Sequence, residues 1–265
     1  MISMTANKKS PRPVTDVAGS HDLSAGATGN RLLDSLPKIQ AAQLSGVWER
    51  VDLLATTVLY PQDGPISHVY FPTSGCCCHV VPLDKHRKIE VTLVGNEGML
   101  GIHLALGLRF SPLMAASVIP GEALRIPARS FMRIMRGVKS LESLIRRYAA
   151  YCLRLASQTI ACNTYHTAEQ RVCRRLLMAH DRAERHDFFL TQDVLGQMLG
   201  VHRQAITPVA RTLQAANLID YRRGVIKILD RKGLEDASCD CYETTKTAYE
   251  SIVMKVRAPA AETDR

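Results

Sequence analysis

The hydrophobic positions of the chain change their spacing twice. Between residues 51 and 126 they form short apolar runs, separated by turn signals such as Pro-Gln-Asp-Gly-Pro and Gly-Asn-Glu-Gly. The runs cover residues 57–60, 66–71, 76–81, 89–94, 115–119 and 123–126. Short strands at this spacing predict an antiparallel sandwich or roll. Before and after this segment the apolar residues recur every three or four positions, which predicts helices.

A long helix is predicted over about residues 140–163. The side chains of its heptad seam follow one another at alternating intervals of four and three residues: Leu141, Ile145, Tyr148, Cys152, Leu155, Thr159 and Cys162. This spacing is typical of a helix that packs against a second helix. We interpret it as the contact of a parallel two-fold dimer, with Arg146, Arg147 and Arg154 outside the seam. The alternative is that the seam packs against the chain's own sheet.

Three other predicted helices begin at residues whose side chains can cap them. Asn30 precedes a short amphipathic helix, and Asp230 precedes the last helix. Thr167 and Gln170 have the spacing of a capping box, in which the glutamine side chain returns to the threonine amide. A further N-terminal helix is predicted around residues 39–48.

Residues 192–209 have the pattern of two short helices that cross steeply through a three-residue turn. Gly196 lies where a side chain would collide with the partner helix, and Gly200 lies where the turn needs a left-handed backbone. The inward-facing positions are all apolar: Leu195, Leu199, Val201, Ile206 and Val209. Thr191 can cap the first helix. The pattern predicts a helix-turn-helix whose second helix spans about residues 203–215.

A strand hairpin is predicted directly after this pair of helices. The run 218–221 is followed by Arg222, Arg223 and Gly224, and then by a second run at residues 225–229. This arrangement indicates a wing with two arginines at its tip. Basic residues there suit phosphate contacts, which position a protein on DNA without reading its sequence. We expect phosphate contacts from Thr191, His202, Arg211, Arg222 and Arg223.

Charge separates the two halves of the chain. The chain has 265 residues with 34 Lys and Arg against 25 Asp and Glu, but residues 166–232 alone hold 12 basic and 7 acidic residues. A basic domain beside a nearly neutral one favours a polyanion as its partner. The sequence contains no apolar stretch long enough for a membrane span and no typical secretory signal. We therefore expect a cytoplasmic protein that does not bind a membrane.

These patterns divide the chain into five parts. Residues 1–29 are rich in small and polar residues without an apolar period, so they are predicted to be a disordered tail. A β-roll follows at residues 30–136, a dimerisation helix at 137–165, a winged helix-turn-helix at 166–235, and a C-terminal helix and tail at 236–265. The fold class is thus α+β, with an N-terminal antiparallel β-roll, a long dimerisation helix and a C-terminal winged helix-turn-helix.

The eight cysteines lack the spacing of a disulfide framework. Cys76, Cys77, Cys78 and His79 are consecutive, but alternate residues of a strand face opposite sides, which would divide them as ligands. We therefore predict no metal site and no cofactor, and we expect Cys152 and Cys162 to be inert buried thiols. No nucleophile elbow or phosphate loop is present, so no catalytic residue is assigned and the chain is not expected to be an enzyme.

The order of these parts resembles the Crp-Fnr family of bacterial transcription regulators over about residues 30–235. The most specific stretch is LTQDVLGQMLGVHRQAITPVARTLQAANLI with the wing that follows, and VYFPTSG and LVGNEGMLG support it in the roll. The resemblance implies a cyclic-nucleotide-binding-like, cupin-like roll and a homodimer that binds a near-palindromic operator in double-stranded DNA. RNA polymerase is a candidate partner. The resemblance also implies that Arg203, Gln204 and Thr207 lie on the base-reading face.

Two features depart from the family pattern. Pro208 stands where many relatives present a polar or charged base contact, and it predicts a local kink or tight turn. In cyclic-nucleotide-binding members a Gly-Glu turn holds the ribose, and Glu97 with Gly98 can take its place here. The Arg-Ser pair that holds the cyclic phosphate is missing from RFSPLMAASV, where Arg109 is the only cation. A buried phosphate would be poorly compensated, so we expect no cyclic nucleotide, and the effector remains unassigned.

A second hypothesis is a ligand-binding regulatory module whose helix-turn-helix serves protein contacts. The basic charge of residues 166–232 and the wing arginines favour DNA instead.

Overall fold

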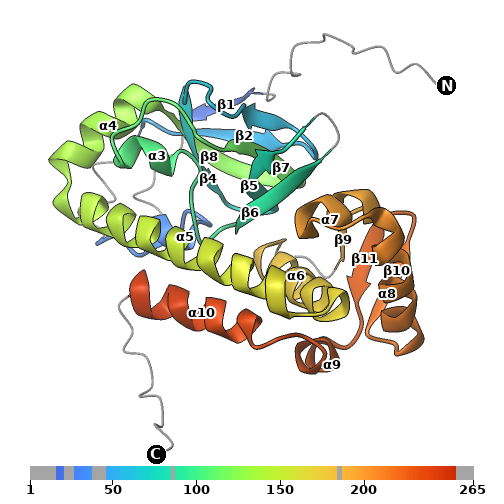
Figure 1. Ribbon diagram of the computed structural model, residues 1–265. Coiled ribbons are helices and arrows are strands. Elements are labelled where there is room, and N and C mark those ends of the chain that lie inside the picture. The colour runs from blue at the N-terminus through green and yellow to red at the C-terminus, as the bar shows by residue number, and fades with distance from the viewer. Residues whose placement is uncertain (1–15, 21–26, 38–45, 85–86, 184–186, 255–265) are drawn as a thin grey trace, which may run out of the picture.

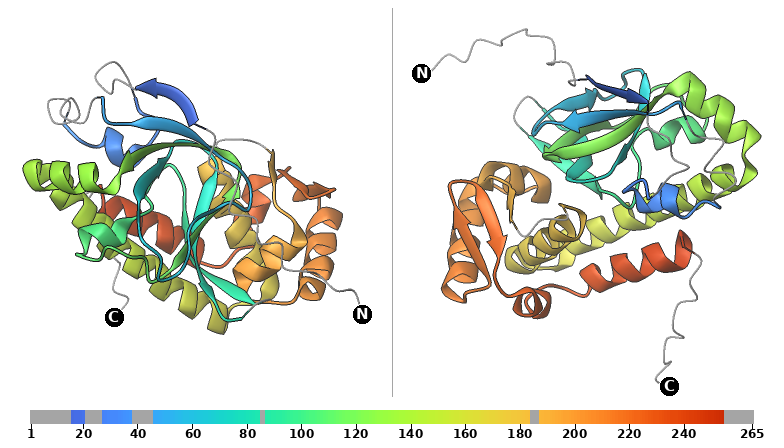
Figure 2. Two further views of the ribbon diagram at one scale, coloured as in Figure 1. Left: turned by 90° about the horizontal axis from the view of Figure 1, so that it is seen from above. Right: turned by 180° about the vertical axis from the view of Figure 1, so that it is seen from behind.

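Figure 1 shows a computed structural model of the chain, which describes residues 16–20, 27–37, 46–84, 87–183 and 187–254. Most of the helix predicted around residues 39–48 lies outside these ranges. The N-terminal part is a β-roll, and the long helix α5 (Lys139–Tyr165) runs beneath it (Figures 1 and 2). The helix-turn-helix and the wing lie at the far end of α5, and the last helix runs back along it. The α+β class and the order of the parts are those predicted from the sequence.

Two four-stranded antiparallel sheets form the roll. The first has the order β1-β2-β8-β4, with β1 (Asp16–Ser20), β2 (Glu49–Leu53), β8 (Gly121–Pro127) and β4 (His68–Pro72). The second has the order β3-β7-β5-β6, with β3 (Val58–Tyr60), β7 (Met114–Ile119), β5 (Cys76–Pro82) and β6 (Lys88–Val94). All six predicted strands are present, with ends displaced by at most two residues. The side chains between the sheets are apolar and fully buried, among them Val69, Phe71, Val94 and Ile126.

Residues 16–20, within the predicted tail of residues 1–29, form strand β1. Strand β1 pairs antiparallel with β2, with Asp16 opposite Val51. A strand at the edge of a sheet is held by backbone hydrogen bonds along one side, so it needs no apolar alternation in its own sequence. Strand β2 was not predicted from the sequence, because only two of its side chains, Val51 and Leu53, are buried.

Short helices close the roll and join it to α5 (Lys139–Tyr165). They are α1 (Arg31–Asp34), α3 (Ile102–Ala105) and α4 (Ala128–Gly137). Asn30 caps α1 as predicted, because its side-chain oxygen accepts from the Leu33 amide at 3.1 Å. The amide group of Asn30 also donates to the backbone oxygens of Pro72 and Gly98, at 2.8 and 2.9 Å, which ties the helix to the roll.

The heptad seam of α5 packs within the chain. Leu141, Ile145, Tyr148, Leu155 and Cys162 are each at most 2% exposed, and Cys152 and Thr159 are half-buried. Side chains already buried inside one chain cannot form the contact with a second copy. The interpretation of this seam as the dimer contact is therefore incompatible with the structure, which follows the alternative of packing within the chain. Heptad spacing reports a buried helix face but does not identify what covers it.

The C-terminal part begins with α6 (Ala168–Ala183), followed by α7 (Gln192–Leu199) and α8 (Arg203–Ala215). The small sheet has the order β10-β11-β9, with β9 (Asp187–Phe189), β10 (Ile219–Arg222) and β11 (Val225–Ile228). The predicted caps are present, because Gln170 accepts from the Thr167 amide at 3.1 Å and Asp230 accepts from the Gly233 amide at 2.9 Å.

Two last helices return the chain to α5. They are α9 (Arg231–Asp236) and α10 (Cys241–Ile252), and α10 lies along α5 in both views (Figures 1 and 2). The rings of Tyr151 and Tyr249 meet edge to face, with centroids 5.3 Å apart, and Arg147 donates to the Val253 carbonyl at 3.0 Å. Within the described ranges, no helix has the length and apolar character of a membrane span.

Candidate nucleic-acid interface

The turn between α7 and α8 has the geometry that its glycines predict. The backbone of Gly200 is left-handed, with a φ of 64°, and it ends α7. A Cβ on Gly196 would lie 2.9 Å from the Val201 carbonyl oxygen, so a side chain would collide with the turn that leads into α8. Thr191 caps α7 by accepting from the Val194 amide at 3.3 Å. These local contacts fix the angle at which α8 leaves the turn.

The outer face of α8 is polar and open to solvent. Ile206, Ala210 and Leu213 face inward and are buried, whereas Arg203 and Gln204 at its N-terminal end are exposed. The Arg203 guanidinium lies 3.5 Å from the Asp193 carboxylate, and both side chains are more than half exposed. An exposed ion pair of this kind contributes little to stability, so Arg203 can exchange its partner.

Thr207 differs from the other two residues expected to read bases. It is half-buried, and its hydroxyl donates to the Gln192 side-chain oxygen at 2.8 Å. The hydroxyl is therefore held against α7, so the exposed base-reading candidates are Arg203 and Gln204.

Pro208 lies within α8, and no tight turn forms there. The helix is assigned without a break from Arg203 to Ala215. Proline removes one backbone donor, which would otherwise bond the carbonyl of Gln204. Its ring is exposed to solvent. The proline therefore costs α8 one hydrogen bond without ending it.

The wing is a tight hairpin that carries two arginines. Arg222 pairs with Val225 across a two-residue loop, and the loop residues Arg223 and Gly224 have φ values of 51° and 82°. Positive φ at both positions is the requirement of a type I′ hairpin. Behind the loop, the Tyr221 hydroxyl donates to the Leu190 carbonyl at 2.8 Å. Burial raises the pKa of Tyr221 to about 12, so this hydroxyl stays protonated and the hydrogen bond persists.

Four of the five expected phosphate contacts are exposed, namely His202, Arg211, Arg222 and Arg223. Arg222 lies 3.0 Å from Asp220, with 82% of its side chain exposed. Arg211 and Arg223 form no ion pair with any residue of the described part of the chain. Thr191 is half-buried because its hydroxyl caps α7. The α8 surface and the wing thus present exposed cations that lack strong internal partners.

The two residues expected to contact an effector lie where the roll meets α6. Glu97 is 4% exposed and accepts from Arg182 of α6 at 2.7 Å and from the Gly95 amide at 3.1 Å. A second buried ion pair joins Glu90 of β6 to Arg175 of α6. Gly98 faces Tyr148, whose hydroxyl oxygen would lie 2.0 Å from a Cβ at this position. Glu97 therefore serves an ion pair between domains and is not free to hold a ribose in this conformation.

The consecutive cysteines of β5 are buried on two sides of the sheet. Cys76 lies 3.8 Å from the Ala179 carbonyl of α6, and burial raises the pKa of its thiol to about 12. His79 bonds to Thr92 at 2.9 Å, and its ring lies 5.7 Å from that of His103. A thiol with a raised pKa is a poor nucleophile at neutral pH. These contacts assign Cys76 and His79 to packing.

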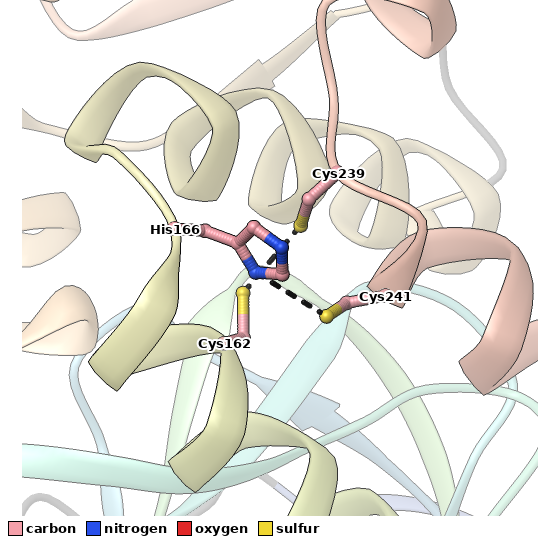
Figure 3. A group of neighbouring side chains, drawn as sticks. All are labelled: Cys162, His166, Cys239 and Cys241. Atoms are coloured by element: carbon pink, nitrogen blue, oxygen red, sulfur yellow. Dashed lines mark hydrogen bonds between the residues drawn. The ribbon is translucent and has the colours of Figure 1, made fainter.

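A different group of thiols was missed by the sequence analysis. The structure brings Cys162 of α5, which we assigned to the heptad seam, together with His166, Cys239 and Cys241 (Figure 3). The last two residues follow the first two by more than 70 positions, so no compact motif marks the group. Only the short spacings gave a weak signal, because one residue separates Cys239 from Cys241 and three separate Cys162 from His166.

Comparisons with known proteins agree with this architecture. Residues 170–237 match the model of the Crp-like helix-turn-helix domain. A comparison with curated proteins finds no match. The fold is similar to that of FixK2 from Bradyrhizobium japonicum, with a TM-score of 0.62 and 17% identity over 73% of this chain and 98% of that one.

Two further solved structures have the same fold. A CRP-family transcriptional regulator from Thermus thermophilus has a TM-score of 0.58 and 16% identity over 71% of this chain and 95% of its own. The c-di-GMP-responsive global regulator CLP from Xanthomonas campestris has a TM-score of 0.55 and 14% identity, and the match covers 69% of this chain and 95% of that one. The chain thus carries a Crp-like helix-turn-helix domain at residues 170–237 within the fold of the Crp/Fnr regulators.

Proposed function

We propose that the protein is a sequence-specific DNA-binding transcription regulator of the Crp-Fnr type that acts in the cytoplasm without an enzymatic activity. The observation that carries this proposal is the exposure of Arg203 and Gln204 at the N-terminal end of α8. The wing presents two more exposed arginines, Arg222 and Arg223. The major groove of DNA admits a helix, and an arginine can donate two hydrogen bonds to one guanine edge. Helix α8 would therefore read bases while the wing contacts phosphates.

A protein partner for the same surface is the second candidate. The core of a protein interface is depleted of charged residues and enriched in aromatic ones. The exposed residues of α8 include Arg203, Gln204, Arg211 and Thr212, and none of the exposed residues of this helix is aromatic. Their chemistry favours a polyanion over an apolar protein surface.

Replacing the two kinds of contact separately tests this assignment. On a site selected from random DNA, Arg203→Ala should reduce the preference for one base at one position in each half-site, with a loss of discrimination of about 1–3 kcal/mol. Replacing Arg222 and Arg223 with Ala should weaken binding on all sequences. It should also make the slope of log K against log salt concentration less steep by about 0.9 for each phosphate contact removed in each subunit. Arg87→Ala, an exposed arginine of the roll, is the control.

The measurement is affinity across a salt series on matched and single-substituted sites. If the Arg203 variant keeps the wild-type base preference and the Arg222 variant changes it, the roles assigned to these two residues are reversed.

We also propose that the protein acts as a homodimer, through a face of α5 other than the heptad seam. An outer stripe of this helix is exposed along its whole length: Arg146, Ala150, Leu153, Ser157, Ile160 and Thr164. Its members recur at intervals of four and three residues, which keeps them on one side of the helix. Leu153 and Ile160 are 71% and 69% exposed, so the stripe presents two large apolar side chains to solvent. A second copy of the same stripe would cover them.

We propose further that a cyclic nucleotide is not the main effector. The buried pair of Glu97 with Arg182 supports this, and Arg109, the only cation of its stretch, is exposed beside Arg129 and Arg133 of α4. Calorimetry with cyclic AMP and cyclic GMP is the test, and we expect no submillimolar binding by either. Submillimolar binding that also tightens DNA binding would overturn the proposal.

A further inference from the structure

Three cysteines and one histidine converge between α5, α6 and α10. Cys162 and His166 lie one helical turn apart at the end of α5, and Cys239 and Cys241 flank the start of α10. Their side chains point toward one another, and the ligand atoms of all four lie within 4.8 Å of one another (Figure 3). Cys162, Cys239 and Cys241 are at most 4% exposed, and His166 is half-buried.

The separations between these atoms are close to those around a tetrahedral zinc ion. The sulfurs of Cys162 and Cys239 are 3.5 Å apart, and the Cys241 sulfur lies 3.6 Å from Nδ1 of His166. Zinc bonds of about 2.3 Å to sulfur and 2.0–2.1 Å to nitrogen place tetrahedral ligand atoms roughly 3.4–3.8 Å apart. Small movements of these side chains would therefore admit the ion.

We propose that Cys162, His166, Cys239 and Cys241 form a structural zinc site. Four protein ligands of the Cys₃His type fill the coordination sphere of zinc, and a closed sphere of this kind is typical of structural sites. Thiolates also prefer soft or borderline ions to magnesium or calcium. The proposal does not depend on the DNA-binding function.

The surroundings of the group suit a site that carries negative charge. Three thiolates around one Zn²⁺ leave a net charge of about −1. Arg174 and Arg171 of α6 lie close enough to interact with these thiols electrostatically, so they can offset that charge. The Gln158 amide donates to the Cys241 sulfur at 3.0 Å, and such a hydrogen bond orients a ligand.

The ligands lie on both sides of the winged helix-turn-helix in the sequence. Cys162 and His166 precede α6, where the chain enters that domain, and Cys239 and Cys241 follow α9, where the chain leaves it. One bound ion would therefore join the segment that enters the domain to the segment that leaves it, and it would hold α10 against α5. The site would fix the position of the DNA-binding domain relative to the long helix.

Metal analysis of the full-length protein, purified anaerobically without chelator, tests the proposal. We expect about one zinc per chain, and the protein stripped of zinc should take up one Co²⁺ with the visible absorption of tetrahedral thiolate coordination. The thermal midpoint should fall when a chelator removes the ion, because the ion binds only the folded chain.

Matched variants separate the site from general damage to the fold. Cys162→Ser and His166→Ala should lose most of the bound zinc, and His166→Cys, which restores a ligand, should keep it. Cys152→Ser, a half-buried thiol of the same helix outside the group, should retain about one zinc per chain. Circular dichroism establishes that each variant is folded, and His166 is half-buried, so its replacement need not disturb the core.

Three results would overturn the proposal. The first is a wild-type protein that holds no zinc and gives no tetrahedral Co²⁺ spectrum. The second is iron with acid-labile sulfide in place of zinc. The third is a Cys162–Cys239 disulfide in the protein as purified anaerobically, found by mass spectrometry without reduction.

Discussion

His79 shows at the scale of one residue how the roll responds to acid. Its imidazole is 2% exposed, with Nδ1 bonded to Thr92 and the ring against His103. Burial and, to a smaller extent, His103 lower the pKa of His79 to about 3. The unfolded chain therefore binds a proton at a higher pH than the folded chain does. Above pH 6.5 this histidine does not reduce the free energy of unfolding. As the pH falls from 6.5 toward 3, it lowers that free energy progressively.

The first prediction is that His79→Asn flattens the acid dependence of stability. At pH 5 the wild type should have lost about 2 kcal/mol through this histidine, and the variant should not, because asparagine keeps a hydrogen-bonding group near Thr92 and does not titrate. Urea denaturation at pH 7.5 and pH 5 measures the difference. His202→Asn, at an exposed position, is the control. If the His79 variant and the wild type lose the same free energy of unfolding between pH 7.5 and pH 5, the imidazole of His79 is not held neutral in the folded chain.

Single residues could be predicted from the sequence where their role is local. Gly200, Thr191 and Asp230 act on backbone within a few positions of themselves, so their residue types indicated their roles. The partner of Glu97 could not be predicted, because Arg182 lies 85 positions away and only the packing of α6 on the roll brings them together. The thiol group around Cys162 was missed for the same reason.

Helix α5 shows what periodicity can and cannot determine for an element. Its heptad spacing located the helix to within two residues at each end and identified the buried face. The same spacing could not distinguish the chain's own roll from a second copy, because both cover an apolar stripe in the same way. Strand β1 illustrates the opposite case, in which backbone pairing forms an element whose sequence carries no apolar pattern.

The second prediction concerns the outer stripe of α5. Replacing Leu153 and Ile160 together with Glu should give folded monomers, because four like charges would meet at the two-fold contact of the dimer. Light scattering at micromolar concentration measures the mass, and circular dichroism measures the fold. Ile145→Glu is the contrast, because it buries a charge inside the chain and should prevent folding instead. A wild-type protein that is monomeric at this concentration would contradict the dimer.

At the scale of the whole molecule, two buried ion pairs hold α6 against the roll. Arg182 meets Glu97 and Arg175 meets Glu90, and all four side chains are at most 8% exposed. A buried pair is costly to break from one side, because the remaining charge loses its partner without regaining water. The position of the helix-turn-helix domain relative to the roll is therefore part of the stability of the fold.

The third prediction is that Arg182→Met lowers the free energy of unfolding by about 3–5 kcal/mol. Combining it with Glu97→Leu should recover much of that loss, because no buried charge then remains unpaired. Urea denaturation of the full chain measures Arg182→Met, Glu97→Leu and the double variant. If the double variant loses as much stability as the two single variants together, the two charges do not act as a pair.

Selection of bound fragments from random DNA tests the central claim most directly. A dimer with one α8 in each of two successive major-groove segments should enrich a near-palindrome, whose half-sites lie one helical turn, about 34 Å, apart. Affinity for that site should exceed affinity for unrelated DNA by roughly 10³-fold or more at the same salt concentration. A protein that enriches no sequence, or binds all DNA with equal affinity, would contradict the account.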